Sequence, residues 1–324
     1  MKYRKLGNTG FEVSEIGYGT WGLGGNSYGD VNDSQAKACL RLALDKGVNF
    51  FDTSDLYGNG HSETLLAQVI REVREKVVIA TKGGTLPHSG FQMPQDFSPD
   101  YLKKALEGSL KRLQTDYIDL YQLHSPRLED INDELLKALQ TFKSDGKIRA
   151  YGISVRSPSD AVQIIDKWGF EVFQINYNMI DQRSREAGFF ARARELNVGV
   201  IVRTPLVFGY LTGALSGEEE FRGIDHRANW PREQLKRWAD APKLFVDLNR
   251  NKTRTTAQLA LLFCLWEDAV STVIPGMMNI TEVEEDIRAS ELPCLTNEEI
   301  DSIKQIYISH DFYDKHAKQI GSKQ

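Results

Sequence analysis

Short apolar runs alternate with longer amphipathic segments along most of the chain. The apolar runs occupy residues 15–21, 49–54, 77–82, 118–124, 150–154, 172–178, 198–204 and 270–276. Between them, apolar residues recur every three or four positions over residues 34–47, 62–75, 98–114, 133–147, 157–169, 185–197, 256–268 and 279–290. Apolar runs of this kind are typical of strands that are buried on both faces, and the three- to four-residue spacing predicts amphipathic helices.

Local start signals support several of these helices. A serine followed by proline, at Ser98 and Ser157, fits a capping residue followed by the first helical position. Ser62 is expected to cap the helix that follows it. Capping residues with a suitable partner three positions later are also expected at Thr255, Asn279 and Thr296.

Eight strand-then-helix units predict a closed (β/α)8 barrel, also called a TIM barrel. The competing fold, a doubly wound open sheet with a dinucleotide fingerprint, lacks its GxGxxG motif, because the glycines at 22, 24, 25 and 29 do not match it. The opening segment reads as a β-hairpin that caps the barrel. No linker divides the chain, so we expect one domain over residues 1–324, with a C-terminal extension from about 291 that begins as a helix. Long loops follow strand three (83–98) and strand seven (205–230), and loops of this length usually have a function.

Composition narrows the class of protein. The 324 residues carry a net charge of −5 and 26% charged residues, an ordinary globular balance without the basic excess that nucleic acids or anionic membranes require. No apolar run approaches the roughly 20 residues that span a bilayer. The three cysteines are far apart, which fits a cytoplasmic protein without disulfides, and no histidine pair has metal-ligand spacing. We therefore expect no metal, no membrane and no nucleic-acid partner.

Polar side chains gather at the predicted carboxyl ends of the strands. They are Asp52 with Tyr57 in the following loop, Lys82, His124, Ser154, Gln174 with Asn176, Arg203 with Thr204, and Gly276. Each has an ordinary structural explanation by itself, such as a loop cap or a lysine that reaches solvent. The carboxyl ends of barrel strands meet at one face, however, and that face carries the active site of such barrels. The convergence of complementary ionisable groups therefore predicts a site.

Four of these residues suit carbonyl reduction. Lys82 can pair with Asp52, which explains a carboxylate at the end of an apolar strand. The nearby ammonium is expected to lower the pKa of Tyr57 and make it a proton donor to a developing alkoxide. His124 can orient the carbonyl oxygen. None of these groups supplies a hydride, so a nicotinamide cofactor is implied.

The motifs FDTSDLYG, ATKGG, LYQLHSP, YGIS, FQINYN, RTPLVFGYLTG and VIPG resemble those of the aldo-keto reductases, in particular bacterial-type members. The resemblance runs from the hairpin to about residue 290. It implies that Asp52, Tyr57, Lys82 and His124 form the catalytic tetrad of an NAD(P)-dependent enzyme that reversibly reduces an aldehyde or ketone, a sugar among the possibilities. The cofactor contacts that it implies are Thr20 and Trp21, Ser154 and Gln174 at the carboxamide, Arg203 stacked on the nicotinamide, and Thr204, Leu206, Gly209 and Leu211 around the pyrophosphate.

Two departures from the family pattern concern the cofactor. Val155 stands where many members have an asparagine that binds the carboxamide. After Gly276 the chain reads MMNITEVEED, so Met278 and three acidic residues, Glu282, Glu285 and Asp286, lie where NADPH-dependent members offer a partner to the 2′-phosphate. A carboxylate there can accept hydrogen bonds from ribose hydroxyls, although Glu282 can equally cap its helix with Asn279. The family default is NADP, and these residues favour acceptance of NAD.

The expected substrate pocket is largely aromatic, and the partner is a small carbonyl compound. Its walls are Trp21, Tyr28, Tyr57, His124, Phe91, Phe208 and Trp230, while Asp225, His226 and Arg227 are expected to hold a loop in place. Two other functions stay open. One is a regulatory subunit that binds the cofactor with little turnover, as in the potassium-channel β-subunits, and the other is an aldolase or isomerase that uses Lys82 as a Schiff-base lysine. The sequence does not indicate the oligomeric state.

Overall fold

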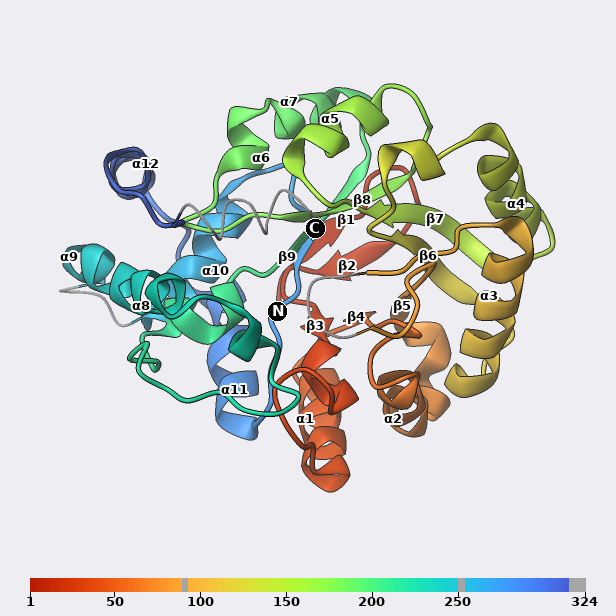
Figure 1. Cartoon of the computed structure of the whole chain (residues 1–324), viewed down its shortest axis with the longest axis horizontal. Coiled ribbons are helices and arrows are strands. Elements are labelled where there is room, and N and C mark those ends of the chain that lie inside the picture. Colours follow the sequence, from red (N-terminus) through yellow and green to blue (C-terminus); the bar gives the residue numbers. More distant parts are fainter. Residues whose placement is uncertain (89–92, 250–253, 315–324) are drawn as a thin grey trace.

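The computed structural model describes residues 1–88, 93–249 and 254–314. Eight parallel strands follow one another around a single sheet: β3 (Tyr18–Gly19), β4 (Phe50–Asp52), β5 (Val78–Gly83), β6 (Ile118–His124), β7 (Ile148–Ser154), β8 (Val172–Asn176), β9 (Gly199–Arg203) and β10 (Thr272–Val273). Isolated bridges between Ile16 and Val273 and between Gly19 and Gly276 join the last strand to the first. The predicted (β/α)8 barrel is confirmed, with the strands at the centre and the helices around them (Figure 1).

The helices of the outer layer begin largely where the capping signals placed them. They are α1 (Asp33–Asp45), α2 (His61–Ile70), α3 (Pro99–Leu113), α4 (Asp133–Ser144), α5 (Pro158–Ile165), α6 (Arg183–Glu186), α7 (Phe189–Leu196), α10 (Thr256–Trp266) and α11 (Ile280–Arg288). Ser98, Ser157, Thr255 and Asn279 each accept a hydrogen bond from the backbone N–H three residues later, as expected. These caps satisfy N–H groups that a helix leaves unpaired at its start.

Three helix predictions were wrong in detail. The segment 185–197 is two helices, because Gly188 has φ 78° and interrupts the helix before α7. Ser62 does not cap α2: the helix begins at His61 after Gly60, and the Ser62 hydroxyl binds Thr20 instead. The helix predicted over 62–75 ends at Ile70 and continues as a 3-10 helix over 71–76.

The helix α10 is not amphipathic, contrary to the prediction. Every residue from 257 to 265 is buried. The helix contacts α11 on one side and the 3-10 helices at 207–212 and 289–291 on others, so that no broad face is left to solvent. A helix that is apolar all round fits this enclosed position.

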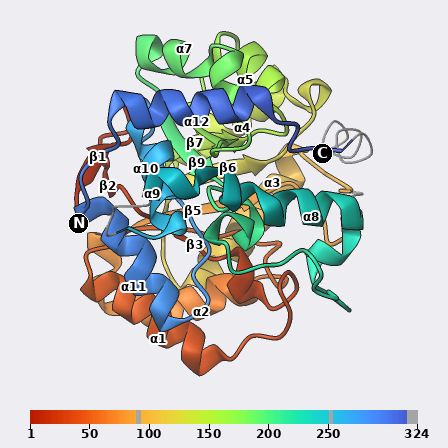
Figure 2. The same ribbon diagram turned by 90° about the vertical axis from the view of Figure 1, so that its left-hand side faces the viewer.

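The long loops and the C-terminal segment contain further helices. The segment after β9 includes 3-10 helices at 207–212, 226–229 and 241–245 and the helices α8 (Arg232–Asp240) and α9 (Val246–Asn249), none of which was predicted. The expected C-terminal helix is α12 (Asn297–Ser309), with a capping box between Thr296 and Glu299, and it crosses the outside of the barrel (Figure 2). Within the described residues, no helix combines the length and apolar character needed to cross a membrane.

The predicted hairpin closes the amino-terminal end of the barrel. Its strands β1 (Tyr3–Lys5) and β2 (Glu12–Ser14) are antiparallel. Leu6, Phe11 and Val13 pack there against apolar side chains that point into the barrel: Phe50, Val78, Ala80, Leu120, Ala150, Val172, Ile201 and Ile274. The hairpin fits closely, because a Cβ at Gly7 would lie 2.2 Å from the backbone nitrogen of Gly199. The hairpin therefore leaves the opposite end, where the strands have their carboxyl ends, uncovered.

Candidate active site

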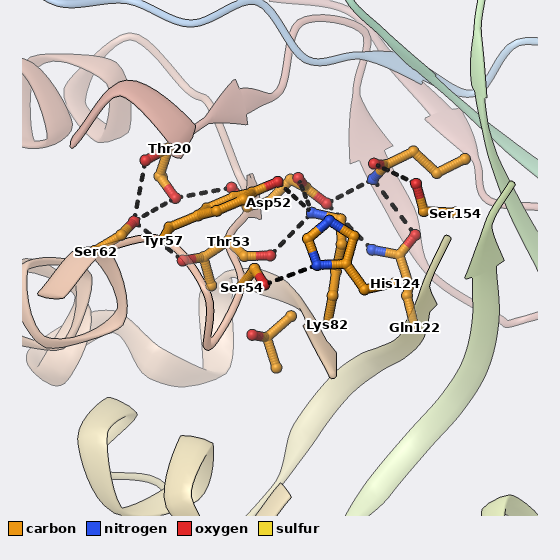
Figure 3. A network of polar contacts seen from close by, with 12 residues as sticks. Thr20, Asp52, Thr53, Ser54, Tyr57, Ser62, Lys82, Gln122, His124 and Ser154 are labelled. Atoms are coloured by element: carbon orange, nitrogen blue, oxygen red, sulfur yellow. Dashed lines mark hydrogen bonds and ion pairs between the residues drawn. The ribbon is translucent and has the colours of Figure 1, made fainter. Parts of the chain in front are cut away.

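A buried ion pair lies at the carboxyl ends of β4 and β5. Lys82 Nζ is 2.5 Å from Oδ1 of Asp52 and 2.9 Å from the carbonyl oxygen of Thr53. The same nitrogen donates to the Tyr57 hydroxyl at 3.1 Å (Figure 3). Lys82 and Asp52 are 0% and 2% exposed, so the ammonium is desolvated and depends on these three oxygens.

Two glutamines complete the environment of Asp52. Its second oxygen, Oδ2, accepts hydrogen bonds from Nε2 of Gln174 at 2.7 Å and Nε2 of Gln122 at 3.1 Å. Ser154 in turn donates to Oε1 of Gln174 at 3.3 Å. Gln122 was missed from the sequence, although it lies two residues before His124 and therefore points to the same side of β6. All the side chains of this group are buried.

The pKa of Tyr57 is shifted in the direction opposite to the predicted one. Burial raises the pKa of the phenol, and this effect exceeds the lowering by the Lys82 ammonium, so that the pKa lies above its usual value of 10.0. The expected lowering was therefore wrong, because desolvation of a phenolate outweighs one charge that Asp52 already neutralises. Burial also lowers the pKa of Lys82, but Asp52 and Tyr57 together raise it above 10.5. Near neutral pH the pair is thus a phenol next to an ammonium.

His124 ends β6 beside this pair. Its ring lies 6.0 Å from the ring of Tyr57 in an edge-on arrangement, and its Nδ1 is 3.2 Å from the Ser54 hydroxyl (Figure 3). Burial, followed by the charges of Lys82 and Arg203, holds the pKa of His124 well below its usual 6.5. The imidazole is therefore neutral at pH 7 and presents its second nitrogen, Nε2, away from Ser54.

The turn after β3 supports Asp52 and carries the aromatic wall. The Thr20 backbone N–H and hydroxyl both bind the carbonyl oxygen of Asp52, each at 2.9 Å. The rings of Trp21 and Tyr28 are 5.3 Å apart, and Phe208 lies 6.2 Å from Trp21. Trp230 joins this aromatic group through Phe208, and Phe91 lies outside the described residues.

His226 also belongs to the aromatic wall, which the sequence did not indicate. Its ring is 4.5 Å from that of Trp21 and 4.6 Å from that of Phe208. His226 also helps to hold its loop in place, as expected, because its backbone N–H donates to the carbonyl oxygen of Ser27 at 2.8 Å. Asp225 forms an ion pair with Arg227 at 2.7 Å in the same loop.

The loop after β9 has an unusual backbone. Thr204, Val207 and Phe208 have φ values of 57°, 49° and 56°, which is rare for residues other than glycine, and Gly209 follows at 94°. Successive turns of this kind direct backbone N–H groups into one concavity, which is a common anion site. Leu206 and Leu211 anchor the loop in the core. At its start, Arg203 is held by the carbonyl oxygen of Val155 at 3.2 Å, and its buried Nε has no hydrogen-bond partner among the described residues.

The segment after β10 is acidic. Glu282 accepts hydrogen bonds from the Met278 backbone at 2.6 Å and from Nδ2 of Asn279 at 2.8 Å, so the carboxylate closes the start of α11. Asp286 is buried, and burial together with Glu285 and Glu282 raises its pKa well above 3.8. Asn279 caps the helix as expected, by accepting from the Glu282 N–H, but the Glu282 carboxylate binds the Met278 N–H rather than the Asn279 N–H of a capping box. The contact of Glu282 with a ribose stays a prediction.

These groups define a site for a carbonyl oxygen. A phenol and a neutral imidazole can both donate to one oxygen atom, and a protonated lysine next to the phenol stabilises the charge that the phenol leaves behind. Arg203 offers a buried Nε–H that has no partner among the described residues, whereas the backbone N–H groups of Val207, Gly209 and Leu211 donate to carbonyl oxygens within the loop. A barrel with such a mouth is compatible with the class of oxidoreductases that act on carbonyl compounds.

Comparison with known proteins agrees with this class, and the chain belongs to the aldo/keto reductase family, whose model matches residues 15–308. It is 32% identical over 318 residues to the "Uncharacterized oxidoreductase YqkF" of Bacillus subtilis, with 98% of this chain and 99% of that protein covered. It is 30% identical to a "Probable voltage-gated potassium channel subunit beta" of Oryza sativa, covering 94% of this chain and 96% of the other. The solved holo form of "aldo-keto reductase AKR11C1 from Bacillus halodurans" superposes with a TM-score of 0.80 at 32% identity, with 98% and 99% of the two chains covered. The protein is therefore an oxidoreductase of small carbonyl compounds, and nicotinamide cofactors are those of its family.

Proposed function

We propose that the protein reduces an aldehyde or ketone with a reduced nicotinamide nucleotide and that Tyr57 is the proton donor. The observation that carries this proposal is the 3.1 Å hydrogen bond between the Tyr57 hydroxyl and Lys82 Nζ, with Asp52 2.5 Å behind that nitrogen. The same ion pair argues against an aldolase that uses Lys82. A Schiff-base lysine must be a neutral amine, whereas the pKa of Lys82 is raised.

The protein groups act on the carbonyl oxygen. Tyr57 and Nε2–H of His124 donate to it, and the Tyr57 proton moves to it as negative charge develops. Lys82 stabilises the phenolate that results, and Asp52 holds the lysine in its charged form. A bound reduced nicotinamide would supply the hydride to the carbonyl carbon. The nicotinamide ring would be held by Ser154, Gln174 and Arg203. The phosphates of the nucleotide would be held by Thr204 and the backbone of 206–211.

We further propose that NADH is accepted, and that NADPH is preferred by no more than about tenfold. The run from 277 to 287 contains no cation, and Glu282 lies in the first turn of α11, with Glu285 and Asp286 further along the helix. An anionic 2′-phosphate next to the Glu282 carboxylate would be repelled, whereas ribose hydroxyls can donate to it. Glu282 is already partly satisfied by its cap, so its effect on a ribose would come from the lone pairs that remain.

The test is a panel of aldehydes, ketones and open-chain sugars assayed with NADH and with NADPH. We expect consumption of NADH with at least one substrate class, and kcat lowered by about 10²–10⁴-fold in Tyr57→Phe. Cofactor binding, followed by fluorescence of the reduced nicotinamide, should be nearly unchanged in this variant. Near-normal turnover in Tyr57→Phe would refute the role of Tyr57.

Two further outcomes of the panel are decisive. NADPH preferred by more than about tenfold, or roughly 1.4 kcal/mol, would refute the cofactor proposal. Tight cofactor binding without turnover on any carbonyl would instead support the alternative function, a regulatory subunit similar to the potassium-channel β-subunit relative.

A further inference from the structure

A buried serine connects His124 to a carboxyl group that the mechanism above does not use. The Ser54 hydroxyl lies 3.2 Å from Nδ1 of His124 and 3.2 Å from Oδ1 of Asp55. The Leu56 backbone N–H donates to the same hydroxyl at 3.1 Å. Ser54 is fully buried, so these three neighbours decide where its single proton points. Figure 3 shows its contact with His124.

The number of hydrogen bonds that Ser54 can make links the protonation state of Asp55 to the tautomer of His124. A hydroxyl donates one hydrogen bond and accepts two, and the Leu56 N–H takes one of the acceptor positions. An ionised Asp55 can only accept, so Ser54 donates to it and the imidazole must carry its proton on Nδ1. A protonated Asp55 can donate to Ser54, which then donates to Nδ1 of His124. The imidazole proton is then on Nε2.

We propose that Ser54 and Asp55 are positioning residues that set the tautomer of His124, so that protonation of Asp55 places the imidazole proton on the nitrogen that faces the substrate. Only that tautomer can donate a hydrogen bond to a carbonyl oxygen. The consequence for catalysis rests on the proposed function of His124. The tautomer change itself does not, because it follows from the hydrogen bonds alone.

The surroundings of Asp55 favour a titration near neutral pH. Burial is the main cause, and Glu63 adds to it, together raising the pKa of Asp55 to about 7. Arg112, whose charge lowers the pKa of Asp55, is already bound to Glu63 at 2.6 Å, and it therefore compensates Asp55 only in part. The other ionisable groups that face Asp55 are two phenols, Tyr101 and Tyr121.

The surroundings of His124 keep it neutral in the same range. The charges that face it are Lys82, Arg203 and His88, and all of them disfavour the imidazolium. Only the two neutral tautomers are therefore populated when Asp55 titrates. Tyr57 titrates above 10.0, so it does not contribute to a pH dependence near 7.

The direct test is the tautomer itself, read by long-range proton–nitrogen NMR of the histidine-labelled protein between pH 6 and 9. We expect the His124 signal to move from the Nε2–H form to the Nδ1–H form as pH rises through about 7. Ser54→Ala and Asp55→Asn should each abolish this change. The matched control is Ser62→Ala, which removes another buried hydroxyl that binds Thr20 and Thr53 but not His124, and should leave the change intact.

The kinetic test is the pH profile of kcat/KM for carbonyl reduction over the same range. Loss of one donor to the reacting oxygen predicts a fall of about 10²-fold above pH 7 in the unaltered protein. Ser54→Ala and Asp55→Asn should each give a profile without this fall. The proposal would be refuted if the pH profiles of these two variants superimposed on that of the unaltered protein. It would also be refuted if the tautomer of His124 did not respond to pH. If no carbonyl is reduced, the proposed function fails, and the NMR result still decides whether Asp55 sets the tautomer of His124.

Discussion

The two ends of the barrel interior differ in chemistry although the same strands build both. On five strands an apolar residue of the lower end is followed, two positions later, by a polar residue of the mouth. The pairs are Phe50 and Asp52, Ala80 and Lys82, Leu120 and Gln122, Val172 and Gln174, and Ile201 and Arg203. Side chains two apart on a strand point to the same side, so one layer of the interior is apolar and the next is polar.

The two layers hold the barrel together by different means. The lower layer is closed by the hairpin and stabilised by burial of apolar surface. In the upper layer one carboxylate accepts from Lys82, Gln122 and Gln174, and removal of any partner leaves a buried group unsatisfied. The lower layer should therefore respond to changes of volume and the upper layer to changes of charge.

The largest effect is expected from Asp52→Asn. The Lys82 ammonium would lose its anionic partner in a buried position, which typically destabilises a protein by about 3–5 kcal/mol. The asparagine amide would also face N–H donors from Gln122 and Gln174. Urea unfolding measures the loss, and the reductase assay should show little remaining activity.

The pH dependence identifies the cause of this loss. In the unaltered protein the pKa of Lys82 is raised, so its contribution is fully present below 10.5 and is lost only as pH rises further. In the variant, burial without a partner favours the neutral amine, and stability should increase toward pH 10. The gap between the two proteins therefore narrows as pH rises, and a constant gap would mean that charge is not its cause.

A smaller effect, confined to stability, is expected from Leu120→Ala. Leu120 is completely buried in the lower layer, and its truncation should reduce the free energy of unfolding by about 2–5 kcal/mol. The mouth lies one layer above, so kcat of the folded variant should stay within about twofold of the unaltered value. Loss of kcat together with stability would show that the two layers are not independent, contrary to the comparison.

The smallest effect is expected at the rim of the mouth, from Glu282→Gln. Removal of this carboxylate should shift the ratio of kcat/KM for NADH and NADPH toward NADPH by up to about tenfold, or roughly 1.4 kcal/mol. Asn279→Ala is the matched control, because it removes the helix cap of Glu282 without a change of charge. The control should lose about 1 kcal/mol of stability and leave the cofactor ratio unchanged. Equal shifts in both variants would assign the effect to the helix start.

The barrel and the polar strand ends were predictable because both follow from local patterns. Strand type, strand order and the caps at Ser98 and Thr255 depend on neighbouring residues in the sequence. Gln122 could also have been found from the alternation of side chains along β6. The break at Gly188 was misjudged because a single glycine is tolerated within many helices, and its positive φ is set by the packing of α6 and α7.

Other features depend on quantities that the sequence does not contain. The direction of the Tyr57 pKa shift is a balance between burial and the charge of Lys82, and burial is known only once the surroundings are. The helix α8 was missed because its exposed face is strongly charged and its few buried residues, such as Trp238, pack on a loop rather than on a strand. The link from Asp55 to His124 joins positions 69 residues apart in the chain, and only the fold brings them together.

The seam between the first and last strands has a consequence for biosynthesis. Strand β3 meets β10 only through the bridges of Ile16 with Val273 and of Gly19 with Gly276, whereas β6 and β7 share a continuous ladder. While the chain is being made, the outer edge of β3 therefore has no neighbour until residues 270–276 leave the ribosome. An unpaired edge of this kind is prone to join another chain. The nascent protein is thus most exposed to misassembly late in translation, when most of the barrel is formed but its last strand has not arrived.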